Sequence, residues 1–249
     1  QMCIRDSMTI EKKPGGPFTA ILSLGRDSQS RGYFVLCSLL AVLVVLSLSL
    51  QETPMTRFLL SMVFALSLIS AGYSVVDSRA MLVWVLGLGL VFAVLAFLSL
   101  LGASPVWDLP AGIAAVLFLL TVTFALLVDI VTGGHGRGIS PGLIAGATAV
   151  YLLIGITFSI IYMVAHLIDP DAFRGLIPVG NVARPNDTLY FSFVTLSTLG
   201  YGDITPTTNL ARMLSVTEAI IGQLYLTILV ARLVGMQIAQ ESPDEPDKS

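Results

Sequence analysis

The sequence predicts an all-α membrane protein with six transmembrane helices, and three observations lead to this fold class. Only 12% of the 249 residues are charged and 55% are hydrophobic, with a mean hydropathy of +0.87. Soluble domains of this length carry about twice that charged fraction. The apolar residues also gather in long uncharged runs, and the breaks between these runs are short and rich in residues that stop helices.

Five of the apolar runs are uncharged and long enough, or nearly so, to cross a hydrocarbon core of about 30 Å, which needs roughly 20 helical residues. They are Tyr33–Leu50, Phe58–Val76, Ala80–Leu101, Ala111–Val128 and Pro141–Ile168. A sixth run, Leu210–Ala239, is apolar except for Arg212, Glu218 and Arg232. Loops as short as Asp77–Arg79 supply too little polar surface for a water-soluble protein with six apolar core helices. We therefore predict that the runs form helical hairpins in a membrane.

The distribution of charge predicts the orientation and the domain organisation. With six crossings, most of the 13 Lys and Arg residues fall on the side of the two termini, which predicts that both termini are cytoplasmic in a multi-pass protein of the plasma or inner membrane. We expect no removable signal peptide, because no small-residue cleavage site follows the first run. The predicted parts are a cytoplasmic segment 1–32, a four-helix transmembrane domain 33–132, a second membrane domain 141–240 and an acidic cytoplasmic tail 241–249.

Composition also excludes several classes of function. A formal net charge of −3 argues against a nucleic-acid-binding protein. Cys3 and Cys37 give neither a disulfide framework nor a set of metal ligands, and no motif predicts a cofactor.

The long connection between the fifth and sixth runs contains a second apolar stretch that is too short to span a bilayer. Leu189–Ser197 predicts a helix of about three turns, with Asn186 or Asp187 as its cap. The helix must end at the glycines of the segment Thr198–Asp203, which reads Thr-Leu-Gly-Tyr-Gly-Asp. Irregular backbone at membrane depth is tolerated only where it faces water or buried protein. We therefore predict a re-entrant helix and loop.

The segment Thr198–Asp203 resembles the selectivity filter of the potassium channel family, in its Leu-for-Val variant. The resemblance covers the last two runs and their connection, and it implies passive K⁺ conduction by a homotetramer. Each chain would then have three identical subunits, the lipid bilayer and K⁺ as its partners. It also implies that backbone carbonyls replace the hydration shell of the ion. The implied filter residues are Thr198, Leu199, Gly200, Tyr201 and Gly202.

The same resemblance assigns roles to the side chains of this segment. Gly200 and Gly202 supply backbone angles that other residues avoid. Tyr201 is expected to point away from the pore axis and to pack against the short helix, with Tyr190 and Phe191. Asp203 is expected at the pore mouth, where its charge raises the local concentration of cations.

The last run contains the residues that we consider for gating. Gly222 is either a hinge or a site of close helix packing. Val230 and Val234, in a stripe with Leu226, either narrow the inner entrance or pack the helix bundle. Gln223 is a candidate for the water-filled cavity below the filter.

Glu218 is a charged residue deep within the last run, and three interpretations remain open. Its carboxyl group can hydrogen-bond to the back of the short helix through Thr195 or Ser197. It can instead face the water-filled side as a cation attractor or proton sensor, or it can meet a partner in a neighbouring subunit.

Two features separate the chain from related functions. No Lys or Arg occurs from residue 80 to residue 136, so these spans lack the charges of an Arg-rich voltage sensor. An intramembrane serine hydrolase, built from Ser104 with His135 or His166, is disfavoured because Pro105 follows the serine where a glycine is needed, so we predict no enzyme activity. We expect both histidines at the surface or the membrane interface. A secondary transporter would need related halves, which are absent, while a weakly selective cation channel remains the alternative to a K⁺-selective one.

Overall fold

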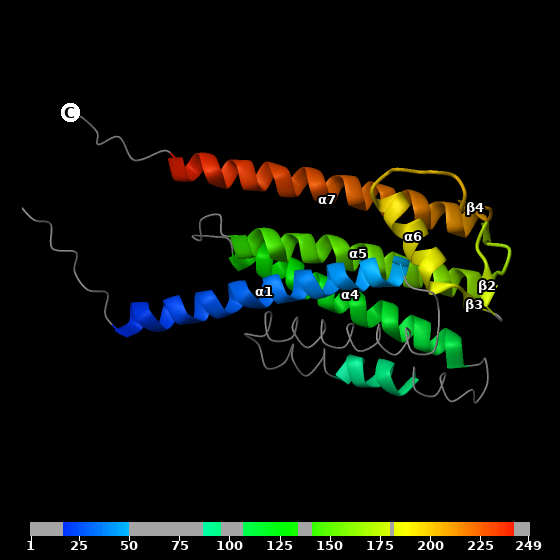
Figure 1. Ribbon diagram of the computed structural model, residues 1–249, viewed down its shortest axis with the longest axis horizontal. Coiled ribbons are helices and arrows are strands. Elements are labelled where there is room, and N and C mark those ends of the chain that lie inside the picture. The colour runs from blue at the N-terminus through cyan, green and yellow to red at the C-terminus, as the bar shows by residue number, and fades with distance from the viewer. Residues whose placement is uncertain (1–16, 50–86, 96–106, 134–140, 180–181, 242–249) are drawn as a thin grey trace, which may run out of the picture.

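The computed structural model of the chain describes residues 17–49, 87–95, 107–133, 141–179 and 182–241 (Figure 1). The labelled helices are α1 (Pro17–Ser49), α4 (Asp108–Gly133), α5 (Pro141–Ile168), α6 (Pro185–Leu196) and α7 (Asn209–Glu241). The strands are short pairs in the connection between α5 and α7, namely β1 (Phe173–Arg174), β2 (Pro178–Val179), β3 (Val182–Ala183) and β4 (Thr205–Pro206).

Four of these helices contain segments that are long and apolar enough to cross a membrane. The segments are Gly32–Ser49, Asp108–Val131, Pro141–Ile168 and Asn209–Arg232, and they coincide with the first, fourth, fifth and sixth predicted runs. The second predicted run lies outside the described residues. Of the third, residues 87–95 are described and are helical. The described part of the chain is therefore a largely helical membrane protein.

Helix α1 begins at Pro17, well before the first apolar run. The polar segment that precedes Tyr33 in the sequence thus continues directly into the helix that carries the first candidate span.

Helix α5 is the centre of the bundle, with α1 and α4 against one side and α7 along another (Figure 1). The apolar faces of α1, α4 and α5 share one buried cluster, because each presents apolar residues at helical spacing. Fully buried members include Leu40 of α1, Leu119 of α4 and Val150 of α5, and Leu189 of α6 joins them. The main core thus joins the N-terminal helices to the short helix α6.

The start of α6 differs from the prediction. The helix begins at Pro185, whose missing N–H costs nothing in the first turn, and no side chain caps it. The two predicted caps have other partners: the Asn186 side chain accepts a hydrogen bond from Ser47 of α1, and Asp187 accepts one from the Ile177 N–H. The cap prediction was wrong because these polar groups join α6 to neighbouring segments.

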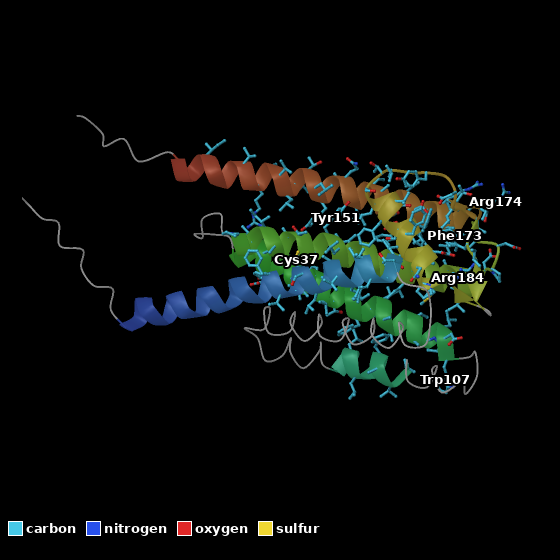
Figure 2. All side chains as sticks on the ribbon, in the orientation of Figure 1. Cys37, Trp107, Tyr151, Phe173, Arg174 and Arg184 are labelled. Carbon is cyan, nitrogen blue, oxygen red and sulfur yellow. The ribbon has the colours of Figure 1, made fainter. Side chains whose placement is uncertain are left out.

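Beyond α6 the chain arcs back over the start of α7 and pairs with the segment that follows α5 (Figure 1). Strand β4 pairs antiparallel with β1, so that Phe173 faces Pro206 and Arg174 faces Thr205. Figure 2 places Phe173, Arg174 and Arg184 at this same end of the molecule. The pairing fixes both ends of the arc, one at α6 and the other at β1.

Candidate functional site

The segment after α6 is attached to the end of that helix by its N–H groups. The Thr198 N–H donates to the Thr195 carbonyl at 2.9 Å, and the Leu199 and Gly200 N–H groups donate to the Val194 carbonyl at 2.9 and 3.3 Å. Within the described residues, no hydrogen bond reaches a backbone carbonyl of residues 198–202. The first three N–H groups of the segment are therefore bonded to the end of α6, while its carbonyls accept no hydrogen bond from the described residues.

The backbone angles of this segment alternate in sign. Thr198, Gly200 and Gly202 have φ of 58°, 58° and 80°, whereas the intervening Leu199 and Tyr201 have negative φ. A backbone whose φ alternates in sign can present successive carbonyls on the same side of the segment. Glycine adopts positive φ without strain, but the β-branched Thr198 does not, which makes its conformation a feature of functional interest.

Two tyrosines and Asp203 support the outer part of the segment. The ring of Tyr201 stacks on that of Tyr190, with centroids 6.4 Å apart and planes 4° from parallel. The Tyr190 hydroxyl donates to Asp203 Oδ2 at 2.8 Å, and this hydrogen bond is the main cause that lowers the pKa of the exposed Asp203 carboxyl. The expected contact of Tyr201 with Tyr190 is therefore present in the structure.

Phe191 lies elsewhere than expected. Its ring packs on those of Tyr162 and Phe173, with centroid separations of 4.9 and 5.4 Å. Phe191 follows Tyr190 by one residue and so points about 100° away around the helix, into the cluster between α5 and β1.

Glu218 is fully buried between α5, α6 and α7, and its partners differ from the predicted ones. The Tyr162 hydroxyl donates to Glu218 Oε2, while Ser192 Oγ lies 2.5 Å from Glu218 Oε1. Glu218 therefore contacts α6, as predicted, but through Ser192 and not through Thr195 or Ser197. Ser197 instead bonds to the Phe193 carbonyl within its own helix.

Two of the remaining candidates on α7, Gln223 and Gly222, contact Thr198 and the end of α6. Gln223 Nε2 donates to Thr198 Oγ1 at 3.2 Å, directly below the alternating segment. Gly222 lies against the end of α6, where an added Cβ would be 2.5 Å from the Leu196 carbonyl oxygen, which supports the packing interpretation. Val230 and Val234 are half exposed within the single chain.

His166 corrects a further expectation. It was expected at a surface or interface, but it is buried at the end of α5, and its Nδ1 has no hydrogen-bond partner in the described part of the chain. Ser104 and His135, the other members of the hydrolase alternative, lie outside the described residues.

A contact with α1 was missing from the sequence prediction. Ser47 Oγ, near the end of α1, donates to Asn186 Oδ1 in the first turn of α6 at 3.1 Å. The two residues are 139 positions apart, and no local pattern relates them. The only available signal was that each is a polar residue beside an apolar helical run.

Comparison with known proteins relates this part of the chain to ion channels. An ion channel family matches residues 176–238, which include α6, the alternating segment and most of α7. Two-pore potassium channel c of Oryza sativa subsp. japonica is 37% identical over 84 residues, which are 34% of this chain and 16% of the rice protein. Protein LctB of Bacillus caldotenax is 32% identical over 90 residues, 34% of this chain and 64% of LctB.

A third relative, Two-pore potassium channel 4 of Arabidopsis thaliana, is 44% identical over 48 residues, 19% of this chain and 17% of the plant protein. The chain thus spans about a sixth of the two plant channels and under two thirds of LctB. No solved structure matches the chain significantly. Residues 176–238 of this chain are therefore similar to an ion channel family, which is not a family of enzymes, and the relatives include potassium channels.

Proposed function

We propose that this chain forms a K⁺-selective channel, with residues Thr198–Gly202 as its selectivity filter. The observation that carries the proposal is the segment of alternating φ whose backbone carbonyls accept no hydrogen bond from the described residues. Dehydrating K⁺ requires several oxygens that replace its water shell, and backbone carbonyls on one edge of a strand supply them. The Thr198 hydroxyl adds a further oxygen at the inner end, and Gln223 lies beside it.

The channel is a homotetramer in this proposal. One chain provides carbonyls from one side, whereas an ion must be surrounded, so four copies are needed to close the ring. Apolar side chains left exposed on α7 support this assembly, because they recur every three or four residues and form a stripe. The stripe consists of Met213, Val216, Ile220, Leu224 and Ile228. In the tetramer, α7 is the inner helix and α5 the outer helix of each pore domain.

The proposed membrane arrangement follows the charge distribution. The channel lies in the plasma or inner membrane with six crossings and both termini cytoplasmic, so Asp203 is at the outer mouth. Because residues 80–136 contain no Lys or Arg, the third and fourth spans do not gate the pore by moving an Arg-rich helix through the field.

The experiment that tests this function is single-channel recording of the purified full chain in planar bilayers under opposed K⁺ and Na⁺ gradients. We expect a reversal potential near that of K⁺ and block by Ba²⁺. Gly200→Ala should abolish the preference for K⁺, because it strains a φ of 58° yet meets no atom of its own chain within 4 Å.

Two outcomes contradict the proposal. Equal permeation of Na⁺ and K⁺ by the unmodified protein would establish the alternative, a weakly selective cation channel. A Gly200→Ala protein that selects K⁺ as well as the unmodified one does would remove residues 198–202 from the filter.

Tyr190→Phe should make the channel more sensitive to acid. The Tyr190 hydroxyl holds the pKa of Asp203 below its usual range, so the carboxylate keeps its charge as the pH falls. Without the hydroxyl the pKa rises toward the ordinary value, and the mouth loses its negative charge at a higher pH. Inward K⁺ current, recorded while the outer solution is acidified from pH 7 to pH 3, should decline at a higher pH in the variant. Superimposable acid profiles would show that Asp203 does not act on the entering ion.

A further inference from the structure

A chain of hydrogen bonds behind α6 links the three helices of the proposed pore domain. Glu218 of α7, Tyr162 of α5 and Ser192 of α6 are all fully buried within one chain. Ser192 Oγ also lies 2.7 Å from the carbonyl oxygen of Gly155 in α5. Four oxygen-bearing groups are therefore in contact with one another and out of reach of water.

The number of available protons limits how this chain is connected. Ser192 has one hydroxyl proton but two close oxygen neighbours, the Gly155 carbonyl at 2.7 Å and Glu218 Oε1 at 2.5 Å. The carbonyl can only accept, so a hydrogen bond to it uses the serine proton. The 2.5 Å contact then requires a proton that belongs to Glu218. If Glu218 were ionised, one of the two oxygen pairs would face each other with no proton between them.

The charge environment leads to the same protonation state. The groups facing the carboxyl are the hydroxyls of Tyr162 on α5 and Ser192 on α6, and both are neutral. On α7 itself, Ser215 is also buried, and its neutral hydroxyl donates to the Ala211 carbonyl. The phenol of Tyr151 on α5 is near enough to sense a charge on Glu218, and β4 carries no titratable side chain. A buried carboxylate without a cation is costly, and such a group binds a proton instead.

We propose that Glu218 is a neutral carboxylic acid that donates to Ser192, while Ser192 donates to the Gly155 carbonyl and Tyr162 donates to Glu218 Oε2. In this state Glu218 is a positioning residue: it holds α7 and α5 against the back of α6, the helix whose end bonds the N–H groups of the filter segment. This role rests on the proposed channel function. Loss of the proton leaves Ser192 with one proton for two acceptors, so one of its two hydrogen bonds, to Glu218 or to the Gly155 carbonyl, is lost and the hold on α6 weakens.

The test compares Glu218→Gln with Glu218→Ala. A glutamine side chain reproduces the neutral acid, because its NH₂ donates to Ser192 and its carbonyl accepts from Tyr162. At pH 6 we expect Glu218→Gln to conduct K⁺ like the unmodified protein, and Glu218→Ala to carry about tenfold less current through loss of two hydrogen bonds. Raising the pH from 6 to 10 should reduce the current of the unmodified protein but not that of Glu218→Gln.

Asp129→Asn is the matched control for this series. Asp129 is also a carboxyl group bonded to a tyrosine hydroxyl, that of Tyr33, but it lies between α1 and α4 and away from α6. The K⁺ current of this variant should fall as the pH is raised from 6 to 10, as it does in the unmodified protein. A Glu218→Gln protein as impaired at pH 6 as Glu218→Ala, or one that loses current in parallel with the unmodified protein at high pH, would overturn the proposal.

Infrared spectroscopy separates this inference from the channel function itself. A neutral carboxylic acid has a carbonyl stretching band that a carboxylate lacks, so the purified protein at pH 7 should show a band that is absent from Glu218→Gln and present in Asp129→Asn. If the band is present and no K⁺ selectivity is found, the proposed function fails and the protonation state holds. If selectivity is found without the band, the inference fails alone.

Discussion

Gly175→Ala is expected to remove most of the folded, assembled protein. Gly175 follows β1 with φ of 92°, and a Cβ at this position would lie 2.2 Å from the backbone carbonyl oxygen of Asp203. Neither atom can move freely, because β1 pairs with β4 directly beyond Asp203. The unfavourable φ costs about 1–2 kcal/mol and the forced backbone shift about 1–3 kcal/mol more.

The measurement is the yield and thermal midpoint of detergent-extracted protein, followed by size-exclusion chromatography. Gly87→Ala is the matched control, because an added Cβ there meets nothing within 4 Å and the residue has an ordinary φ within a helix. A Gly175→Ala protein that elutes and melts like the control would show that the chain around β1 and β4 accommodates the change and does not fix the end of segment 198–203.

Gly222→Ala should destabilise the protein even though alanine is the better helix former. The added Cβ would be 2.5 Å from the carbonyl oxygen of Leu196 and 2.9 Å from its Cδ1. Leu196 is fully buried at the end of α6, so it has no space to withdraw. Overpacking of this kind costs about 1–3 kcal/mol, more than the gain of about 0.5–1 kcal/mol in helix propensity.

Gly235→Ala is a control for which the change in thermal midpoint should have the opposite sign. Gly235 lies on the same helix, and an added Cβ meets nothing within 4 Å, so only the gain in propensity remains and the thermal midpoint should rise. Each variant makes the same Gly→Ala change at a single position of α7. If Gly222→Ala also raised the midpoint, the close approach of α7 to Leu196 would not exist in the assembled protein, and the hinge interpretation of Gly222 would be favoured.

The sequence predicted those features that depend on local chemistry. Long apolar runs gave the four candidate spans of the described chain, and the two glycines after an apolar stretch gave a short helix that ends where α6 ends. Positive φ at Gly200 and Gly202 follows from the same reasoning, because glycine is the residue that adopts it readily. Positive φ at Thr198 does not follow, since the residue type argues against it.

Features that depend on the register between helices could not be predicted from the sequence. Glu218 contacts Ser192 and not Thr195 because Gly222 packs on Leu196. One helical turn before these two residues lie Glu218 on α7 and Ser192 on α6, which therefore face each other. Nothing in the order of residues sets that register. The β1–β4 pairing was also missed, because two-residue strands containing proline show no alternating pattern.

The hydrogen bonds from residues 198–200 to Val194 and Thr195 have a consequence for how the channel is made. Each of them closes a loop of only a few residues, so the entropy lost in forming it is small and its contact order is low. The segment can therefore take its shape while the chain is still a monomer. In the proposed tetramer, subunits that meet with this segment already formed lose less conformational entropy on association, which raises the affinity between them.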